Sequence, residues 1–187
     1  MLTRTRSFGF WISCFACLAI AASLRAQEES LEDFKYKEDY DRVQSILKNP
    51  DPVKRAERFV TLYGDRADMR GDLRSYVDNV FTKDMEAIFK QGNFTALKSL
   101  SERALKTRPR FAEAHFFRGL ALKREKKMDE ALKEFARAYV LESPIKANAK
   151  QQLDLTYRST GGSLAGQEKI VLDAMKEFNI TPPKKRN

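Results

Sequence analysis

Apolar residues recur three or four positions apart along almost the whole chain, and no segment alternates apolar and polar residues with the period of two expected of strands. We therefore predict an all-α fold. The first four stripes are Leu31, Phe34, Val43, Ile46 and Leu47; Val53 to Tyr63; Leu73, Val77, Val80, Phe81, Met85, Ile88 and Phe89; and Phe94, Leu97, Leu100, Ala104 and Leu105.

Capping and breaking residues separate these stripes. Asp51 is placed to cap the second helix and Pro52 to occupy its first turn, while Gly64 is expected to close it. The third helix breaks at Gly92, and the fourth stops before Pro109. The predicted helices thus arrive in pairs, which invites a search for internal repeats.

The segment 112–145 carries small and aromatic residues at fixed intervals. Its first helix holds His115, Arg118-Gly119 and Leu122, and its second holds Ala131, Phe135 and Ala138 in the spacing A-x-x-x-F-x-x-A, followed by Pro144. This pattern resembles the 34-residue tetratricopeptide repeat, TPR. In that family each repeat is a hairpin of two antiparallel helices.

Such spacing has a physical reason in close helix contact. Gly119 and Ala131 have side chains small enough to let the two helices touch, and Ala138 does the same toward the next hairpin. Phe135 fills the space that the small residues leave, and Pro144 is expected to stop the helix and redirect the chain.

A second, weaker repeat lies 34 residues earlier, over 78–111. Gly92 stands at the turn, and Leu97, Ala104 and Pro109 correspond to Ala131, Ala138 and the proline stop. Met85 stands where the glycine belongs. The resemblance implies an α-solenoid of about two TPR units, 78–145, with flanking capping helices.

The flanking segments complete the predicted layout. Residues 27–77 form an N-terminal helical pair or degenerate repeat, residues 146–180 form C-terminal capping helices, and residues 181–187 are a basic tail. Because fewer than three repeats rarely form a stable domain, these flanks are expected to be integral to the fold.

The first 26 residues have the order of a secretory signal peptide. Arg4 and Arg6 precede an uncharged run over 8–22, and small residues place the cleavage after Ala26 or after Ala21. The uncharged run is shorter than the roughly 20 residues that a spanning helix needs, so an uncleaved anchor is the weaker alternative. We expect export to a bacterial periplasm or, otherwise, secretion.

Removal of this leader would change both the cysteine content and the net charge of the chain. Cys14 and Cys17 lie within it, so the exported chain would contain no cysteine. The formal net charge of +9 falls to about +6 without the three arginines of the leader. The basic runs lie at 106–110, 123–127 and 184–186; such runs are usually solvated helix faces or tails, and the alternative is a site for an anionic partner.

Candidate chemistry is sparse. The chain has one histidine, His115, which stands at an aromatic position of the repeat and is expected to be packed there. The stretch "TGGSLAGQE" lacks the lysine and the serine or threonine of a P-loop. No carboxylate pair suggests acid and base roles. We therefore expect a non-enzymatic protein with no cofactor, no metal site and no small-molecule substrate.

The TPR resemblance implies a concave groove lined by the first helix of each repeat, which receives an extended peptide or another protein. The family's geometry makes these residues groove-facing candidates: Thr82, Glu86, Phe89, Lys90, Glu113, Phe116, Leu120, Lys123 and Arg124. Lys90, Lys123 and Arg124 would select acidic groups, although Lys123 and Arg124 also suit a helix C-terminus on electrostatic grounds alone. The lysine and asparagine clamp of chaperone-binding TPR proteins is not reproduced.

A scaffold or adaptor for a protein partner is therefore the favoured function. The alternative is an electrostatic binder of a polyanion, such as nucleic acid or an anionic envelope polymer, through the runs at 106–110 and 123–127. Nucleic acid is the less favoured partner, because few aromatic residues lie among these lysines.

Overall fold

A computed structural model describes residues 36–161 and 164–182, and these residues form helices and connecting turns without a strand. The chain divides into two units, Met1–Gln44 and Ser45–Asn187. In the first unit, residues 36–44 are helical, and this helix ends at residue 47. The predicted signal peptide, the predicted helix start near Leu31 and most of the predicted basic tail lie outside the described residues.

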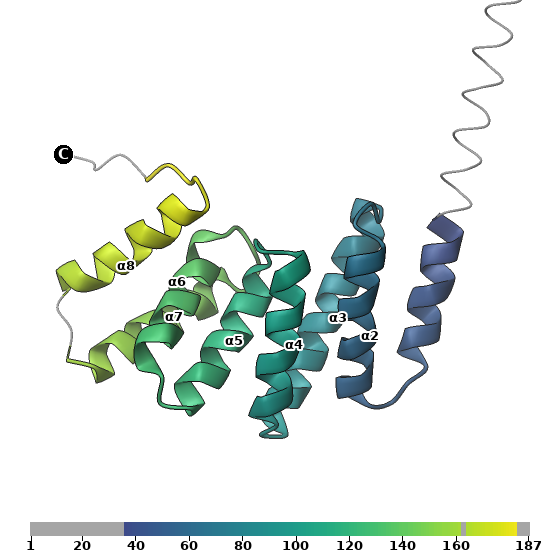
Figure 1. The fold of residues 1–187 in the computed structure, drawn as a ribbon, viewed down its shortest axis with the longest axis horizontal. Coiled ribbons are helices and arrows are strands. Elements are labelled where there is room, and N and C mark those ends of the chain that lie inside the picture. The colour runs from purple at the N-terminus through teal and green to yellow at the C-terminus, as the bar shows by residue number, and fades with distance from the viewer. Residues whose placement is uncertain (1–35, 162–163, 183–187) are drawn as a thin grey trace, which may run out of the picture. The chain divides into compact units, whose positions relative to one another are not determined.

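The larger unit contains seven further helices (Figure 1). They are α2 (Pro52–Asp65), α3 (Gly71–Lys90), α4 (Phe94–Thr107), α5 (Ala112–Arg124), α6 (Met128–Val140), α7 (Lys146–Ser159) and α8 (Leu164–Glu177). For the described residues the all-α prediction is confirmed. No helix among them is long and apolar enough to cross a membrane.

The start of α2 follows the predicted chemistry. The Asp51 side chain accepts a hydrogen bond from the backbone N–H of Val53 at 2.9 Å, and Pro52 occupies the first turn. The predicted closure at Gly64 is wrong by two residues, because α2 continues through Gly64 to Asp65. Gly64 keeps a negative φ and therefore does not act as a left-handed cap.

Helix starts recur at a fixed interval in this unit. Helices α4 and α6 begin at Phe94 and Met128, which are 34 positions apart. Helices α5 and α7 begin at Ala112 and Lys146, which are also 34 positions apart. Helix α3 begins at Gly71, so the predicted boundary between 77 and 78 falls inside it.

The turns before α4 and α6 repeat as well. Gly92 and Lys126, again 34 positions apart, have left-handed backbones with φ of +73° and +63°. The next residue in each turn, Asn93 or Lys127, donates its backbone N–H to the carbonyl five positions earlier, at 3.2 and 3.0 Å. The two connections are therefore the same structural motif, although only one of them uses glycine.

The closest approach between helices lies between α5 and α6. A Cβ atom built on Gly119 would lie 2.6 Å from Cε1 of Phe135, which is closer than real Cβ contacts come. Phe135 is itself fully buried, as are Ala131 and Ala138 on the same side of α6. The predicted close packing of the 112–145 hairpin is confirmed at this contact.

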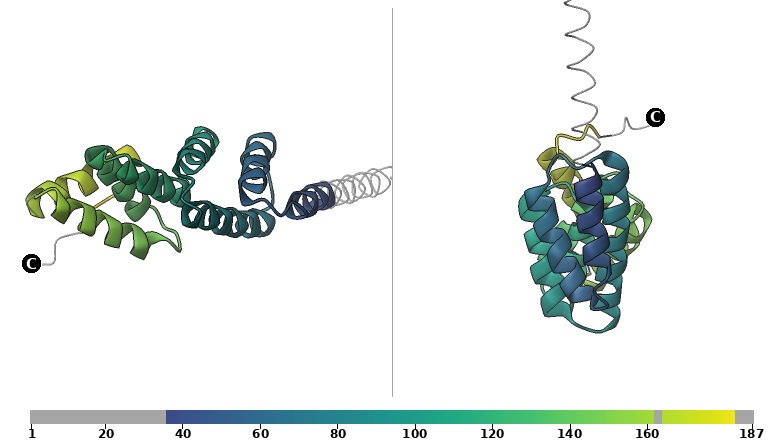
Figure 2. Two further views of the ribbon diagram at one scale, coloured as in Figure 1. Left: turned by 90° about the horizontal axis from the view of Figure 1, so that it is seen from below. Right: turned by 90° about the vertical axis from the view of Figure 1, so that its right-hand side faces the viewer.

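Neighbouring helices continue the packing on both sides of this hairpin. Helix α4 packs against α5, and α7 packs against α6. Helices α2 and α4 contact each other as well as α3, and they lie on the same side of α3 (Figure 2). Leu97 and Ala104 on α4 are fully buried, as expected of repeat-packing positions.

The C-terminal end differs from expectation in where α6 ends and in the helix against which α8 packs. Helix α6 ends at Val140, four residues before Pro144, because the backbone of Leu141 becomes extended while its side chain stays buried. Helix α8 packs against α6. Its end reaches the start of α5, where Arg110 donates to the carbonyl of Phe178 at 2.9 Å.

We predict that Ala131→Leu lowers the melting temperature distinctly, because the buried site beside α5 has no room for three more carbons. The expected loss is about 1 to 3 kcal/mol of the free energy of unfolding, measured by thermal and urea denaturation. Ala147→Leu, at an exposed position of α7, is the matched control and should leave the midpoint nearly unchanged. Equal midpoints for the two variants would contradict the packing described above.

Candidate partner-binding face

The predicted groove residues lie on α3 and α5, and they differ in exposure. Glu86, Lys90 and Arg124 are exposed, and 38% of Phe89 is exposed. The half-buried members are Thr82, Glu113, Leu120 and Lys123. Phe116 is only 8% exposed, because its ring packs against Phe117 and Phe135 with centroids 5.4 and 6.0 Å apart. It therefore adds little area for a partner.

A polar pocket of about 300 Å³ lies beside the N-terminal halves of α3 and α5 and brings Thr82 and Glu113 together. Its wall continues along α3 through Ser75, Asp78 and Asn79, and then along the α4–α5 and α6–α7 connections. Hydroxyl, amide and carboxylate groups all line this pocket. Such a mixture can bond a peptide backbone, which offers both donors and acceptors.

One wall of the polar pocket is held by an arginine that the sequence places within a basic run. Arg108 makes two bonds to the Asp78 carboxylate, Nη1–Oδ1 at 2.5 Å and Nη2–Oδ2 at 2.8 Å. Its guanidinium also lies over the rings of Tyr63 and Phe111, 4.6 and 4.1 Å from their centroids. Arg108 is thus committed to holding α2, α3 and the start of α5 together.

Tyr63 supports Asp78 and Arg108 from behind the pocket lining. Burial, and after it the charge of Asp78, raise the pKa of Tyr63 well above its ordinary value. The phenol therefore stays protonated and donates to Asp78 at 2.7 Å. The Tyr63 ring packs edge-on against Phe81 and Phe111, with centroids 5.9 and 5.8 Å away. The Asp78 carboxylate thus accepts hydrogen bonds from both Tyr63 and Arg108.

A second cluster lies where α3 and α5 end. The rings of Phe89 and Phe94 meet edge to face with centroids 5.7 Å apart, and the Arg124 guanidinium carbon lies 5.5 Å from the centroid of Phe94. Lys123 donates to the side chain of Gln152 on α7 at 3.1 Å. Sequence reasoning missed Phe94 as a surface residue, because the residue also belongs to the apolar stripe of α4.

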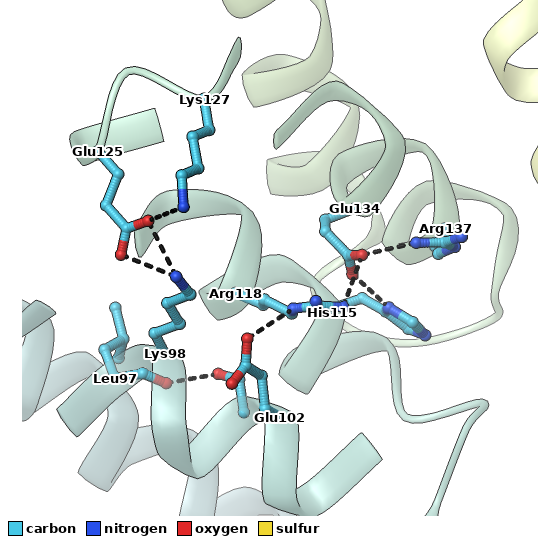
Figure 3. A network of polar contacts seen from close by, with 10 residues as sticks. Leu97, Lys98, Glu102, His115, Arg118, Glu125, Lys127, Glu134 and Arg137 are labelled. Atoms are coloured by element: carbon cyan, nitrogen blue, oxygen red, sulfur yellow. Dashed lines mark hydrogen bonds and ion pairs between the residues drawn. The ribbon is translucent and has the colours of Figure 1, made fainter. Parts of the chain in front are cut away.

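His115 is the centre of a buried charged cluster (Figure 3). The histidine is 5% exposed, so the predicted packed position is confirmed. Its Nδ1 lies 2.7 Å from Oε2 of Glu134, and its Nε2 lies 2.9 Å from the carbonyl oxygen of Pro109. A carbonyl can only accept, so Nε2 carries a proton. Both ring nitrogens of His115 are therefore engaged within the protein.

Glu134 joins His115 to two arginines. Arg118 and Arg137 donate to its Oε1 at 3.0 and 2.6 Å, opposite His115. Burial raises the pKa of Glu134, but the hydrogen bond and charge of His115 and the charges of Arg118 and Arg137 outweigh it, so the pKa is lowered. The sequence held a signal for this cluster: Glu134 lies on the same stripe as Ala131 and Ala138.

This charged cluster joins four helices, α4, α5, α6 and α8. Arg137 extends it to α8 through Glu177 at 2.9 Å, and Arg118 extends it to α4 through Glu102 at 3.5 Å. Each charge is therefore used to join helices. Among residues 36–161 and 164–182, no group of three or more histidine, cysteine or acidic residues is arranged to hold a metal ion.

Many cations of the two internal basic runs are also engaged. Besides Arg108, Arg110 donates to the Phe178 carbonyl and lies near its ring, with 5.6 Å between the guanidinium carbon and the centroid. Lys127 pairs with Glu125 at 3.0 Å, and Lys98 of α4 pairs with the same carboxylate at 2.9 Å (Figure 3). These contacts leave no continuous track of free cations along 106–110 and 123–127.

Comparison with known proteins does not assign a family. No protein-family model, no curated protein and no solved structure matches the chain.

We predict that Glu134→Gln lowers the free energy of unfolding at pH 7 by about 3 kcal/mol, because it removes a buried charge and leaves the half-buried guanidinium groups of Arg118 and Arg137 without their counter-charge. Folding lowers the pKa of Glu134, so the stabilisation from its charge is complete above the unfolded pKa of about 4.3. It is lost as the pH falls through the lower folded pKa. Urea denaturation from pH 7 to pH 3 should therefore bring the two proteins together at the acidic end.

Glu102→Gln is the control for this prediction. Glu102 contacts the same Arg118 but lies at the surface, with 40% of its side chain exposed. Its removal should cost less than about 1 kcal/mol. A loss as large as that of Glu134→Gln, or a Glu134→Gln loss that does not change with pH, would show that the buried charge does not hold the helices together.

Proposed function

We propose that the chain is a non-enzymatic adaptor of the TPR type, which binds an extended segment of another protein on the face formed by α3 and α5. In this proposal α3–α4 and α5–α6 are the two repeats, 78–111 and 112–145, and the flanking helices cover the ends of a short solenoid. The adaptor would act outside the cytoplasm, a placement that rests on the pattern of residues 1–26 alone.

The observation that carries the proposal is that groove-facing positions of two successive repeats meet at shared surfaces. Thr82 and Glu113, from different repeats, line one polar pocket. At the other end of the same helices, Phe89 of α3 contacts Phe94, and Arg124 of α5 lies over that second ring. A face with apolar area, backbone-bonding groups and cations suits an extended peptide.

Recurrence supports the solenoid part of the proposal. Helix starts and left-handed turns return after 34 positions, the repeat length of the family. The close contact of Gly119 with Phe135 fits the role of small residues in such hairpins. A polyanion is the less favoured ligand, because Arg108, Arg110 and Lys127 are engaged within the protein.

We predict that Phe89→Ala weakens partner binding about tenfold, because Phe89 is the more exposed of the two phenylalanines among the groove-facing candidates. A photo-crosslinking amino acid at Glu86 of the full chain, in its own cells, would capture the partner for identification. Affinity for the identified partner would then be measured for the wild type and for Phe89→Ala.

Tyr76→Ala is the matched control. Tyr76 is another exposed aromatic of α3, at 46% exposure, and its position thirteen residues before Phe89 places it on roughly the opposite side of the helix. It should bind the partner like the wild type. Equal losses of affinity for the two variants, or no loss for Phe89→Ala, would overturn the proposed face. If the logarithm of the binding constant falls steeply and linearly with the logarithm of the salt concentration, the result would favour a polyanion instead.

A further inference from the structure

Exposed basic and aromatic side chains lie together where α3 and α5 end. We define the aryl–arginine patch as Phe89, Lys90, Phe94, Leu120 and Arg124. Lys90 and Arg124 stand at corresponding positions, 34 apart, in the last turns of α3 and α5. Both side chains are exposed. In α7 the corresponding position is Arg158, which is again exposed and again in the last turn.

The balance of nearby charge leaves this patch positive. The acid one turn before Lys90 is Glu86, but the residue one turn before Arg124 is Leu120, so Arg124 has no acidic neighbour on that side of its own helix. Glu125, the next residue along the chain, is shared by Lys98 and Lys127. Glu125 is therefore engaged by two lysines outside the patch, and Lys90 and Arg124 remain the exposed cations of the patch.

The geometry of Arg124 prepares it for an acidic group. Its guanidinium lies over the Phe94 ring, 5.5 Å from the centroid, which restrains the side chain before any partner binds. A contact with a ring uses none of the guanidinium N–H groups for a hydrogen bond, so these groups can still form a bidentate bond to a carboxylate. Phe89, 38% exposed beside it, offers apolar area next to that charge.

We infer that the aryl–arginine patch binds a protein segment in which an acidic side chain is adjacent to an apolar one. The carboxylate would bond to Arg124, and the apolar side chain would pack on Phe89 and Leu120. This inference rests on the proposed binding face and specifies the chemistry of its partner. Nucleic acid fits less well, because the Phe94 ring is already near Arg124, while Lys123 and Lys127 are bonded to Gln152 and Glu125.

The test uses the full chain and a fluorescein-labelled peptide built from Ser-Glu-Leu repeats. Its counterpart replaces every glutamate by glutamine and so keeps the shape while removing the charge. We expect the glutamate peptide to bind about tenfold more tightly in fluorescence anisotropy, as charge-assisted bonds are about twice as strong as neutral ones. Arg124→Gln should abolish this preference, and Arg124→Lys should restore part of it.

Lys106→Gln is the control, because Lys106 is an exposed cation in the last turn of α4 that lies outside the patch. It should leave the preference for glutamate unchanged. Equal affinity of the two peptides, or an equal loss from Lys106→Gln and Arg124→Gln, overturns the inference. Tight binding of a labelled single-stranded oligonucleotide that depends on Arg124 also overturns it.

Failure of this inference can be told apart from failure of the proposed function. If both peptides bind equally and Phe89→Ala weakens both, the acid preference is wrong while the binding face stands. If Phe89→Ala changes neither peptide binding nor capture of the cellular partner, the face itself is wrong.

Discussion

The contact between Gly119 and Phe135 is the constraint on which the hairpin of α5 and α6 depends. A side chain at position 119 would have to occupy the space that the phenylalanine ring already fills, 2.6 Å from a Cβ atom. Dispersion attraction needs such direct contact, because small gaps forfeit much of its energy. The close approach also brings Glu134 of α6 within bonding distance of His115 and Arg118 of α5. The apolar contact and the charged cluster are therefore two consequences of one interhelical distance.

The preceding hairpin solves the same packing problem with other residues. Met85 and Ser101 stand where the next repeat has Gly119 and Phe135, and both are fully buried. A large and a small side chain have thus exchanged helices, as conservation of core volume allows. Ser101 satisfies its hydroxyl by donating to the Leu97 carbonyl at 2.7 Å. The sequence pattern of 78–111 is weak for this reason, although its turn and helix starts keep the same interval.

Local patterns predicted the helices well, because apolar spacing, Asp51 and Gly92 act within a few residues of one another. What the sequence did not reveal depends on distant partners. Arg108 belongs to a basic run in the sequence, but its charge is paired with the carboxylate of Asp78, thirty positions earlier in the chain. Phe116 sits at a groove-facing position of the family, yet Phe135 draws it into the core. Exposure and charge at a site follow from tertiary neighbours, which spacing alone does not identify.

The recurrence also separates positions that packing controls from positions that face solvent. Positions 85 and 119 both lie in the core, so a change at one requires a compensating change on the opposite helix. Positions 90 and 124 face solvent, so packing does not select their charge, yet both are basic. Favourable interaction with the helix C-terminus explains a cation at each, and it is worth about 0.3 to 1 kcal/mol. It does not explain why the Phe94 ring lies near Arg124 and against the exposed ring of Phe89, because the interaction of a cation with the helix C-terminus requires neither aromatic ring. That arrangement costs exposed apolar area, which binding a partner would recover.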